Sequence, residues 1–400
     1  MTPKQRTFTL FLAGSGLLAA ALMFSPKAPP PTKTPPTSVV VAPPIAPPTP
    51  TPIDPPAPTK ADDRPLIQIA LLLDNSGSMS GLLEQAKSQL WHLVNQLSEA
   101  KKGGQRPRIE LALYEYGERP MRLVDFTTEL DLVSEALFGL QIRGGDEWCG
   151  RTIADALENL RWSSNPDVMK VIFIAGNEPF DQGDLAPSLA VERAKARGIT
   201  VNTIYCGDGR SEEAQGWKTG AVLAQGRFLT IDQNHQVAEV VAPQDEALAR
   251  LGVEINTTYI PYGHEGRAGA QRQMEQDNNS QGYGLGNFSQ RTISKASAVY
   301  HNPSWELVDA LKDGRVQLGE LKEEALPEPM KKMNAEERTG YVKEQAKKRG
   351  ELQAEIRRLT AERQAFLDQH KQEAGPTSLD VAMLEAVRGL ATRHGFELGR

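Results

Sequence analysis

Short, largely apolar runs alternate with amphipathic segments over residues 64–251. The clearest apolar runs are 67–73 (IQIALLL), 171–175 (VIFIA) and 200–205 (TVNTIY). Runs of this length and composition are typical of strands that are buried on both faces of a sheet. Apolar residues recur at helical spacing in the segments 80–100, 130–138, 152–161, 185–197, 212–224 and 236–251. The alternation predicts an α/β domain with a doubly wound, mostly parallel sheet, covered by helices on both faces and closed by the last of these segments.

The pattern changes after residue 251. Residues 252–300 are rich in Gly, Gln and Asn, which indicates a connector. Within it, residues 265–278 can form a polar helix, which is either a solvated part of the connector or a partner-binding face. Residues 301–400 carry helical patterns and are predicted to form an α-helical C-terminal region.

A long charged helix is expected in this last region. It begins at Asn334, which forms a capping pair with Glu337, and ends near residue 372. Its apolar positions with heptad-like spacing are Leu352, Ile356, Leu359 and Phe366. Gln345 and Arg349 interrupt the heptad. The pattern predicts a weak coiled coil, which can form a homodimer, or a single helix packed along one seam in a hairpin with residues 378–392.

The N-terminal 63 residues differ from the rest in composition. Lys4 and Arg6 precede an uncharged apolar run over residues 8–24, which predicts either a signal peptide within residues 1–25 or an uncleaved N-terminal membrane anchor. Residues 26–63 hold more than half of the 28 prolines. Such a segment forms extended polyproline II, on the order of 100 Å long, and is expected to be a disordered stalk. Both alternatives for the leader export the remaining chain.

Composition and missing motifs exclude several classes of function. The net charge is -6 and no basic stripe with interleaved aromatic residues is present, so nucleic acid is not an expected partner. The sequence has no Walker loop, no HExxH motif and no GxSxG motif, and its six histidines are scattered. We therefore predict a protein that is not an enzyme.

Three oxygen-bearing side chains follow the first buried run. The sequence LLLDNSGSM brings Asp74, Ser76 and Ser78 to the predicted carboxyl end of a strand, where open sheets of this class bind ligands. A carboxylate and two hydroxyls are hard ligands suited to Mg²⁺ or Mn²⁺. The alternative is a turn in which Asp and Ser side chains make capping bonds to the next helix.

The DNSGSM motif within this α/β alternation resembles the von Willebrand factor type A domain and its metal-ion-dependent adhesion site. The resemblance implies that Asp74, Ser76 and Ser78 bind a cation together with Thr152, which stands in the second-loop sequence GGDEWCGRTIADAL. It also implies Mg²⁺ or Mn²⁺, with Ca²⁺ as a further option. The cation of that family keeps one coordination place open for an acidic residue of a protein partner.

The third loop departs from the family pattern. The family has an Asp at the end of the central strand, whereas VIFIAGNEP has Gly176 there. Glu178, Asp146 or Glu147 could compensate for it, and Asn177 offers an amide oxygen. Loss of the third-loop carboxylate is expected to weaken the metal site or to leave a degenerate one.

The chain has two cysteines, Cys149 and Cys206. Both follow predicted loops at the carboxyl end of the sheet. In an exported chain, an even number of cysteines indicates a disulfide between them.

The whole layout resembles bacterial exported or membrane-anchored proteins of unknown function that combine a type A domain with a GNEP loop, a YIPYG segment and a charged helical tail. Together these features predict an exported binding module for metal-assisted protein–protein adhesion or assembly. We expect it in the periplasm or cell envelope, attached to the inner membrane if the N-terminal segment is uncleaved. The alternative is a structural envelope scaffold in which the sheet domain is inert and the helical tail acts.

Overall fold

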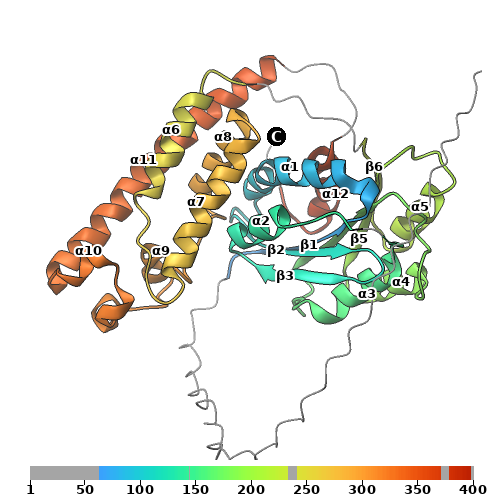
Figure 1. Ribbon diagram of the computed structural model, residues 1–400, viewed down its shortest axis with the longest axis horizontal. Helices are drawn as coiled ribbons and strands as arrows, with labels where there is room; N and C mark the ends of the chain where they lie inside the picture. Colours follow the sequence, from blue (N-terminus) through green and yellow to red (C-terminus); the bar gives the residue numbers. More distant parts are fainter. Residues whose placement is uncertain (1–62, 144, 233–240, 371–377, 398–400) are drawn as a thin grey trace, which may run out of the picture. The chain divides into compact units, whose positions relative to one another are not determined.

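The computed structural model describes residues 63–143, 145–232, 241–370 and 378–397. It contains a six-stranded sheet with the order β3-β2-β1-β4-β5-β6 (Figure 1). The strands are β1 (Leu66–Asp74), β2 (Arg108–Tyr116), β3 (Met121–Thr127), β4 (Met169–Gly176), β5 (Thr200–Tyr205) and β6 (Phe228–Thr230). β3 pairs antiparallel with β2 and every other pair is parallel. The predicted doubly wound, mostly parallel sheet is confirmed. The direction of strand addition reverses between β1 and β4, which is where such sheets bind ligands.

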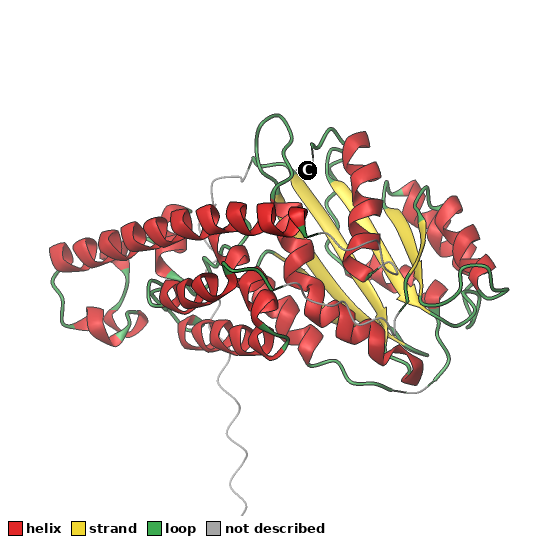
Figure 2. Cartoon of the chain, turned by 90° about the horizontal axis from the view of Figure 1, so that it is seen from above, coloured by secondary structure: helices red, strands yellow, loops and turns green. Residues whose placement is uncertain are grey.

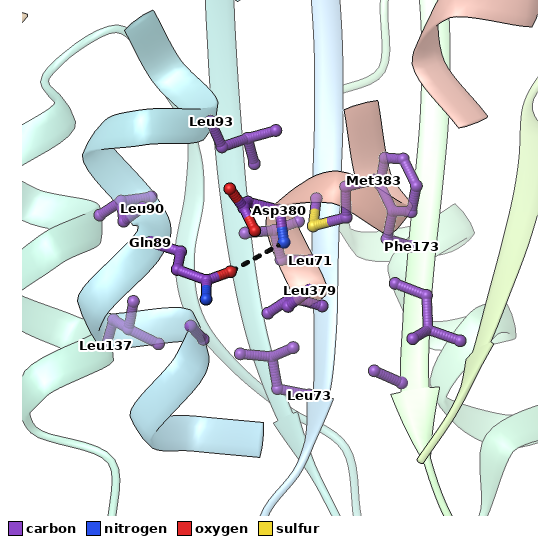
Figure 3. Close-up of a pocket in the computed structure, with 13 residues that line it drawn as sticks. Leu71, Leu73, Gln89, Leu90, Leu93, Leu137, Phe173, Leu379, Asp380 and Met383 are labelled. Atoms are coloured by element: carbon purple, nitrogen blue, oxygen red, sulfur yellow. Dashed lines mark hydrogen bonds between the residues drawn. The ribbon is translucent and has the colours of Figure 1, made fainter. Parts of the chain in front are cut away.

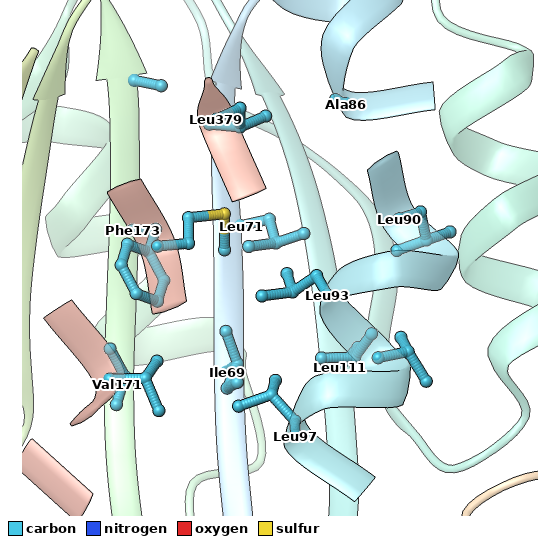
Figure 4. Packing of buried hydrophobic residues seen from close by; sticks show 14 of the residues in the cluster. Ile69, Leu71, Ala86, Leu90, Leu93, Leu97, Leu111, Val171, Phe173 and Leu379 are labelled. Atoms are coloured by element: carbon cyan, nitrogen blue, oxygen red, sulfur yellow. The ribbon is translucent and has the colours of Figure 1, made fainter. Parts of the chain in front are cut away.

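Both faces of the sheet are buried under helices, as Figure 2 shows from above. The alternation of side chains along β1 sends Ile69 and Leu71 to one hydrophobic cluster and Ala70 and Leu72 to the other. The first cluster lies under α1 (Ser80–Ser98), α2 (Leu130–Phe138) and α12 (Leu379–Arg393). The second lies under α3 (Cys149–Asn159), α4 (Pro187–Ala196) and α5 (Ala214–Leu223). Figure 4 shows leucines of α1 and Leu379 packed onto the strands in the first cluster.

The first face is closed by α12, which comes from the far end of the chain. Its first two backbone N–H groups are bound by side chains of α1. Leu379 N donates to Gln85 Oε1 (3.1 Å). Asp380 N donates to Gln89 Oε1 (3.0 Å), as Figure 3 shows. His92 Nδ1 lies 2.7 Å from the Asp380 carboxylate. Three α1 side chains therefore bind groups at the start of a helix that sequence analysis assigned to a hairpin.

The predicted closing helix differs from the structure. Residues 233–240 lie outside the described part, and the helix that follows, α6 (Asp245–Asn256), packs against α8 (Leu285–Ala296) and α11 (Ala335–Gln369). Its apolar face therefore contributes to the helical region.

The remaining helices form this helical region. They are α7 (Gly266–Gly282), α9 (Leu307–Lys312) and α10 (Glu328–Lys331), together with α6, α8 and α11. The suggested connector thus contains two regular helices, α7 and α8. Gln273, Gln276 and Asp277 of α7 are buried, so this polar helix is neither a solvated connector nor an exposed binding face along its whole length.

The long helix α11 begins at the predicted capping box, with Asn334 and Glu337 bound to each other's backbone. Its buried apolar seam packs against α6 and α8 of the same chain. α11 does not form the expected hairpin with α12. Arg349 lies on this seam and binds the fully buried carboxylate of Glu306 (2.8 Å). The expectation that Arg349 interrupts the seam was wrong because a buried partner neutralises its charge. The coiled coil and homodimer lack support, since the chain's own helices cover the seam.

A buried ionic cluster joins the helical region to the sheet domain. Arg291 of α8 is fully buried and binds Asp131 of α2 (2.5 Å) and Asp277 of α7 (2.8 Å). Its guanidinium lies 4.3 Å from the centre of the Trp91 ring of α1. Removal of one partner from such a cluster leaves an uncompensated buried charge, so the cluster fixes how these helices pack.

None of the described helices is long and apolar enough to cross a membrane. The predicted leader at residues 1–25, and all but the last residue of the predicted stalk at 26–63, lie outside the described residues.

Candidate functional site

Asp74 is the last residue of β1 and is fully buried. Its Oδ1 accepts a hydrogen bond from the Ser76 backbone N–H (2.7 Å), which turns the chain away from the strand. A 3-10 turn at Gly77–Met79 then leads directly into α1. The carboxylate is therefore held by a tight strand-to-helix turn at the reversal point of the sheet.

Ser76 and Ser78 lie next to each other, with their Oγ atoms 3.1 Å apart. Ser78 Oγ donates to Asn177 Oδ1 (3.1 Å), so the first loop contacts the third loop that follows β4. Ser76 is buried and Ser78 is exposed. The two predicted first-loop hydroxyls therefore lie between the buried Asp74 carboxylate and solvent.

Thr152, the predicted second-loop ligand, is fully buried in the first turn of α3. Its Oγ1 donates to the carbonyl of Trp148 (2.8 Å), which leaves the oxygen lone pairs able to accept or to coordinate. Its role in metal binding stays a prediction.

Glu147 is the acid that the fold brings to Asp74. It is 1% exposed, and its carboxyl and that of Asp74 lie within hydrogen-bond reach of each other. Burial, reinforced by Glu147, raises the pKa of Asp74 to about 9. Asp74 Oδ2 and Glu147 Oε1 are buried oxygens without an ordinary hydrogen-bond donor. Two such carboxyls can share a proton or a cation, because two adjacent negative charges in a buried site repel each other.

The other two candidate acids take different positions. Asp146 is exposed, although it directly precedes Glu147. Glu178 is half-buried, and its backbone carries the contacts that tie the loops together: its N–H lies 3.4 Å from Glu147 Oε2 and its carbonyl accepts from Trp217 Nε1 (2.8 Å). Glu147 was one of three acids expected near the site, and spacing alone could not tell which of their side chains points toward Asp74.

Gly176 is required by the packing around it. A Cβ atom at this position would lie 2.6 Å from Tyr116 Oη and 3.2 Å from Asp74 Oδ2. Tyr116 Oη donates to the carbonyl of Ala175 (2.9 Å) and is fully buried. The phenol of β2 therefore occupies space that a third-loop side chain would need, which explains the missing third-loop Asp in steric terms.

The donor set fits a small, hard divalent cation. Two buried carboxylate oxygens lack donors, and two hydroxyls lie at the adjacent loop. Among the described residues no group of three or more His, Cys, Asp or Glu side chains could hold a metal. A cation here would accordingly be bound by Asp74 and Glu147, with hydroxyls and water completing its coordination.

The predicted disulfide between Cys149 and Cys206 was wrong, since both are buried free thiols. Cys149 packs in the hydrophobic cluster under α3, with its Sγ 3.7 Å from Tyr116 Oη. Cys206 packs in the cluster on the opposite face of the sheet. Both residues lie near the carboxyl edge, as predicted, but the sheet separates them.

One protein family matches the sequence of the sheet domain. A sequence model of the von Willebrand factor type A (VWA) domain matches residues 68–236. The comparison with curated proteins found no match.

Several solved structures are similar in part. The conserved hypothetical protein BatB from Bacteroides thetaiotaomicron is 15% identical, with a TM-score of 0.33, 42% of this chain covered and 90% of that one. The VWA domain of a type V pili tip protein from Porphyromonas gingivalis is 14% identical, with a TM-score of 0.32 and coverages of 46% and 99%. A thread matrix protein from the mussel byssus, with a zinc-occupied adhesion motif, is 15% identical, with a TM-score of 0.35. This chain spans 42% of its length, and 42% of this chain is covered.

Proposed function

We propose that this chain, whose residues 68–236 match the VWA domain model, is a binding module that captures a protein partner through a divalent cation at the carboxyl end of its sheet. VWA domains typically mediate protein–protein interaction and are generally not catalytic. The partner, the cation and the cellular location are parts of the proposal.

One observation carries the proposal: Asp74 and Glu147 form a buried acid pair with an unpartnered oxygen on each side chain. An inert domain that kept only its fold would have no need to bury two carboxyls together, because each costs desolvation free energy. A divalent cation compensates both charges at once. Mg²⁺ and Mn²⁺ suit these hard ligands best, and Ca²⁺ is a further candidate.

Five residues of the chain would bind the cation. Asp74 and Glu147 would contribute buried carboxylates, Ser76 and Ser78 the hydroxyls nearer to solvent, and Thr152 the second-loop hydroxyl. A bound cation would supply positive charge at the surface, where an acidic side chain of the partner can coordinate it. Asn177, through its bond to Ser78 Oγ, orients the exposed hydroxyl.

The proposed setting rests on the sequence. The apolar leader at residues 1–25 and the proline-rich segment at 26–63 support an exported module held away from a membrane in the cell envelope. The alternative scaffold function through the helical tail has less support, because the buried seam of α11 packs on helices of the same chain.

The proposal is tested by titrating the full chain with Mg²⁺, Mn²⁺ and Ca²⁺ after chelation, using calorimetry and tryptophan fluorescence. We expect saturable binding that Asp74→Ala abolishes and Glu147→Gln weakens at least about tenfold. Glu178→Gln is the matched control in the neighbouring loop and should bind like wild type. Absence of saturable binding at millimolar metal, or equal effects of the two Gln variants, would contradict the proposed site. A bound metal without metal-dependent capture of envelope proteins would contradict the proposed function only.

A further inference from the structure

A second polar site lies away from the strand ends, where the sheet domain meets the helical region. A cleft of about 480 Å³ opens between the C-terminal part of α1, helix α8 and the C-terminal third of α11, and Arg106 also lines it. Cavities of this volume accept small molecules, and junctions between structural units are common places for them. None of the residues proposed to bind the cation lines this cleft.

Positive charge predominates among the side chains of the cleft. Its lining contains three arginines, Arg106, Arg357 and Arg363, and one acid, Glu99. Arg363 is committed to the fully buried carboxylate of Asp245 (2.6 Å). Arg106 pairs with Glu99 at 3.0 Å, but both side chains are more than a third exposed, so this pair is weak and exchangeable.

Arg357 carries the inference. Among the described residues no carboxylate forms an ion pair with it. Its hydrogen bond within the protein is a long one, from Nη1 to the carbonyl of Ala296 (3.3 Å). Ala296 ends α8, so a purely structural role for Arg357 is to cap that helix. This bond uses one of five N–H donors and leaves the rest of the guanidinium fork available to an anion.

The neutral lining defines the ligand further. Gln96, Gln364 and Thr360 place amide and hydroxyl groups around the cleft, and no aromatic side chain lines it. A flat ring would therefore find no stacking partner. Thr360 Oγ1 donates to the carbonyl of Ile356 (2.7 Å) and Gln364 Nε2 donates one N–H to Asp368 (3.1 Å), so a molecule with several oxygens would find the second amide N–H of Gln364 and the guanidinium groups. The chemistry is that of a compact, non-aromatic anion.

We propose that this cleft binds a small, oxygen-rich, non-aromatic anion whose carboxylate or phosphate group is held by Arg357 and Arg106. Binding there would join α1 of the sheet domain to α11 of the helical region through one ligand. The site is independent of the cation site, and its test does not depend on the proposed adhesion function.

The test uses the full chain and four probes: inorganic phosphate, citrate, glucose 6-phosphate and uncharged glucose, each at matched ionic strength. Thermal shift and calorimetry should detect saturable binding of at least one anion, with bare anions binding on the order of 1 mM, and none of glucose. Tighter binding of citrate assigns a carboxylate ligand, and tighter binding of glucose 6-phosphate assigns a phosphorylated one.

Two neighbouring arginines provide the variants. Arg357→Gln should weaken anion binding at least about tenfold. Arg358→Gln is the control, because Arg358 is exposed, as Arg357 is, but does not line the cleft and pairs with Glu355 (2.6 Å). Circular dichroism verifies that both variants fold. The proposal is overturned if no anion stabilises the protein beyond the effect of sodium chloride, or if the two variants lose binding equally.

Discussion

Replacement of Asp74 by Asn is expected to stabilise the metal-free protein. In that state the Asp74 carboxyl is buried beside Glu147, and burial raises its pKa from 3.8 to about 9. At pH 7 the native state therefore keeps a proton that the unfolded chain has released, and this difference favours unfolding. Asparagine has almost the same shape, has no charge to desolvate, and can donate a hydrogen bond from its amide to Glu147.

The magnitude follows from the two pKa values. The interval between pH 7 and 3.8 is 3.2 pH units, and each unit is worth about 1.36 kcal/mol. The resulting cost of about 4 kcal/mol is an upper bound, because relaxation and water entry reduce penalties of this kind. We expect Asp74→Asn to gain about half of the bound, about 2 kcal/mol, at pH 7. The native state holds the extra proton between about pH 4 and pH 9, so the gain grows as the pH rises through that window.

The assay is urea unfolding in the presence of a chelator at pH 5 and pH 7, with Asp146→Asn as the exposed control. The free energy of unfolding of Asp74→Asn should exceed that of wild type by about 2 kcal/mol at pH 7 and by less than about 1 kcal/mol at pH 5. Saturating Mg²⁺ should reverse the order, because it stabilises only a protein that binds it. A variant that is destabilised equally at both pH values without metal would refute the reasoning about the buried acid pair.

Three further outcomes can be measured. Leu390→Ala, at a buried position of α12, should lower the free energy of unfolding in urea by about 2–5 kcal/mol. Val381→Ala, at a position of the same helix that is 51% exposed, should change it by less than about 0.5 kcal/mol. Equal effects would mean that α12 does not cover the sheet. Arg349→Met should cost about 3–5 kcal/mol because it leaves the Glu306 carboxylate buried without its cationic partner. Adding Glu306→Gln should recover part of that loss in a double-mutant cycle. Reducing agent should leave the melting temperature unchanged, and mass spectrometry should find both cysteines alkylated only after unfolding; one cross-linked pair would contradict the buried thiols.

The sheet was predictable because its signals are local. A parallel strand that is buried on both faces must be apolar over its whole length, and β1 and β4 satisfy this condition directly in the sequence. The motif around Asp74 was visible for a related reason. A strand end, a carboxylate and two hydroxyls follow each other within five residues, so their meeting depends on one turn.

The remaining parts of the site depend on contacts between distant segments. Glu147 and Asp146 are adjacent in sequence, and only the packed loop decides that the first is buried and the second exposed. Gly176 looked like a lost ligand until Tyr116 was found in the space beside it. The two cysteines were correctly placed near one edge, but residue order alone did not reveal that they lie on opposite faces.

The helical region was harder to predict because its interior contains charges. Arg349 and Arg363 look like solvent-facing residues in a heptad, yet both are buried against acids contributed by other elements. A sequence pattern based on apolar residues cannot find such a seam, since each charge is acceptable only when its partner is known.

The origin of α12 has a consequence for how the protein is made. Roughly 300 residues separate the end of β1 from the start of α12. At ordinary ribosomal speed this interval takes on the order of tens of seconds to synthesise. Until α12 is made, the part of the first face that it covers stays exposed beside α1 and α2, and the same holds for a polypeptide that is threaded N-terminus first through a translocation channel. A chain that is terminated before α12 should therefore expose apolar surface and be readily recognised by chaperones and proteases.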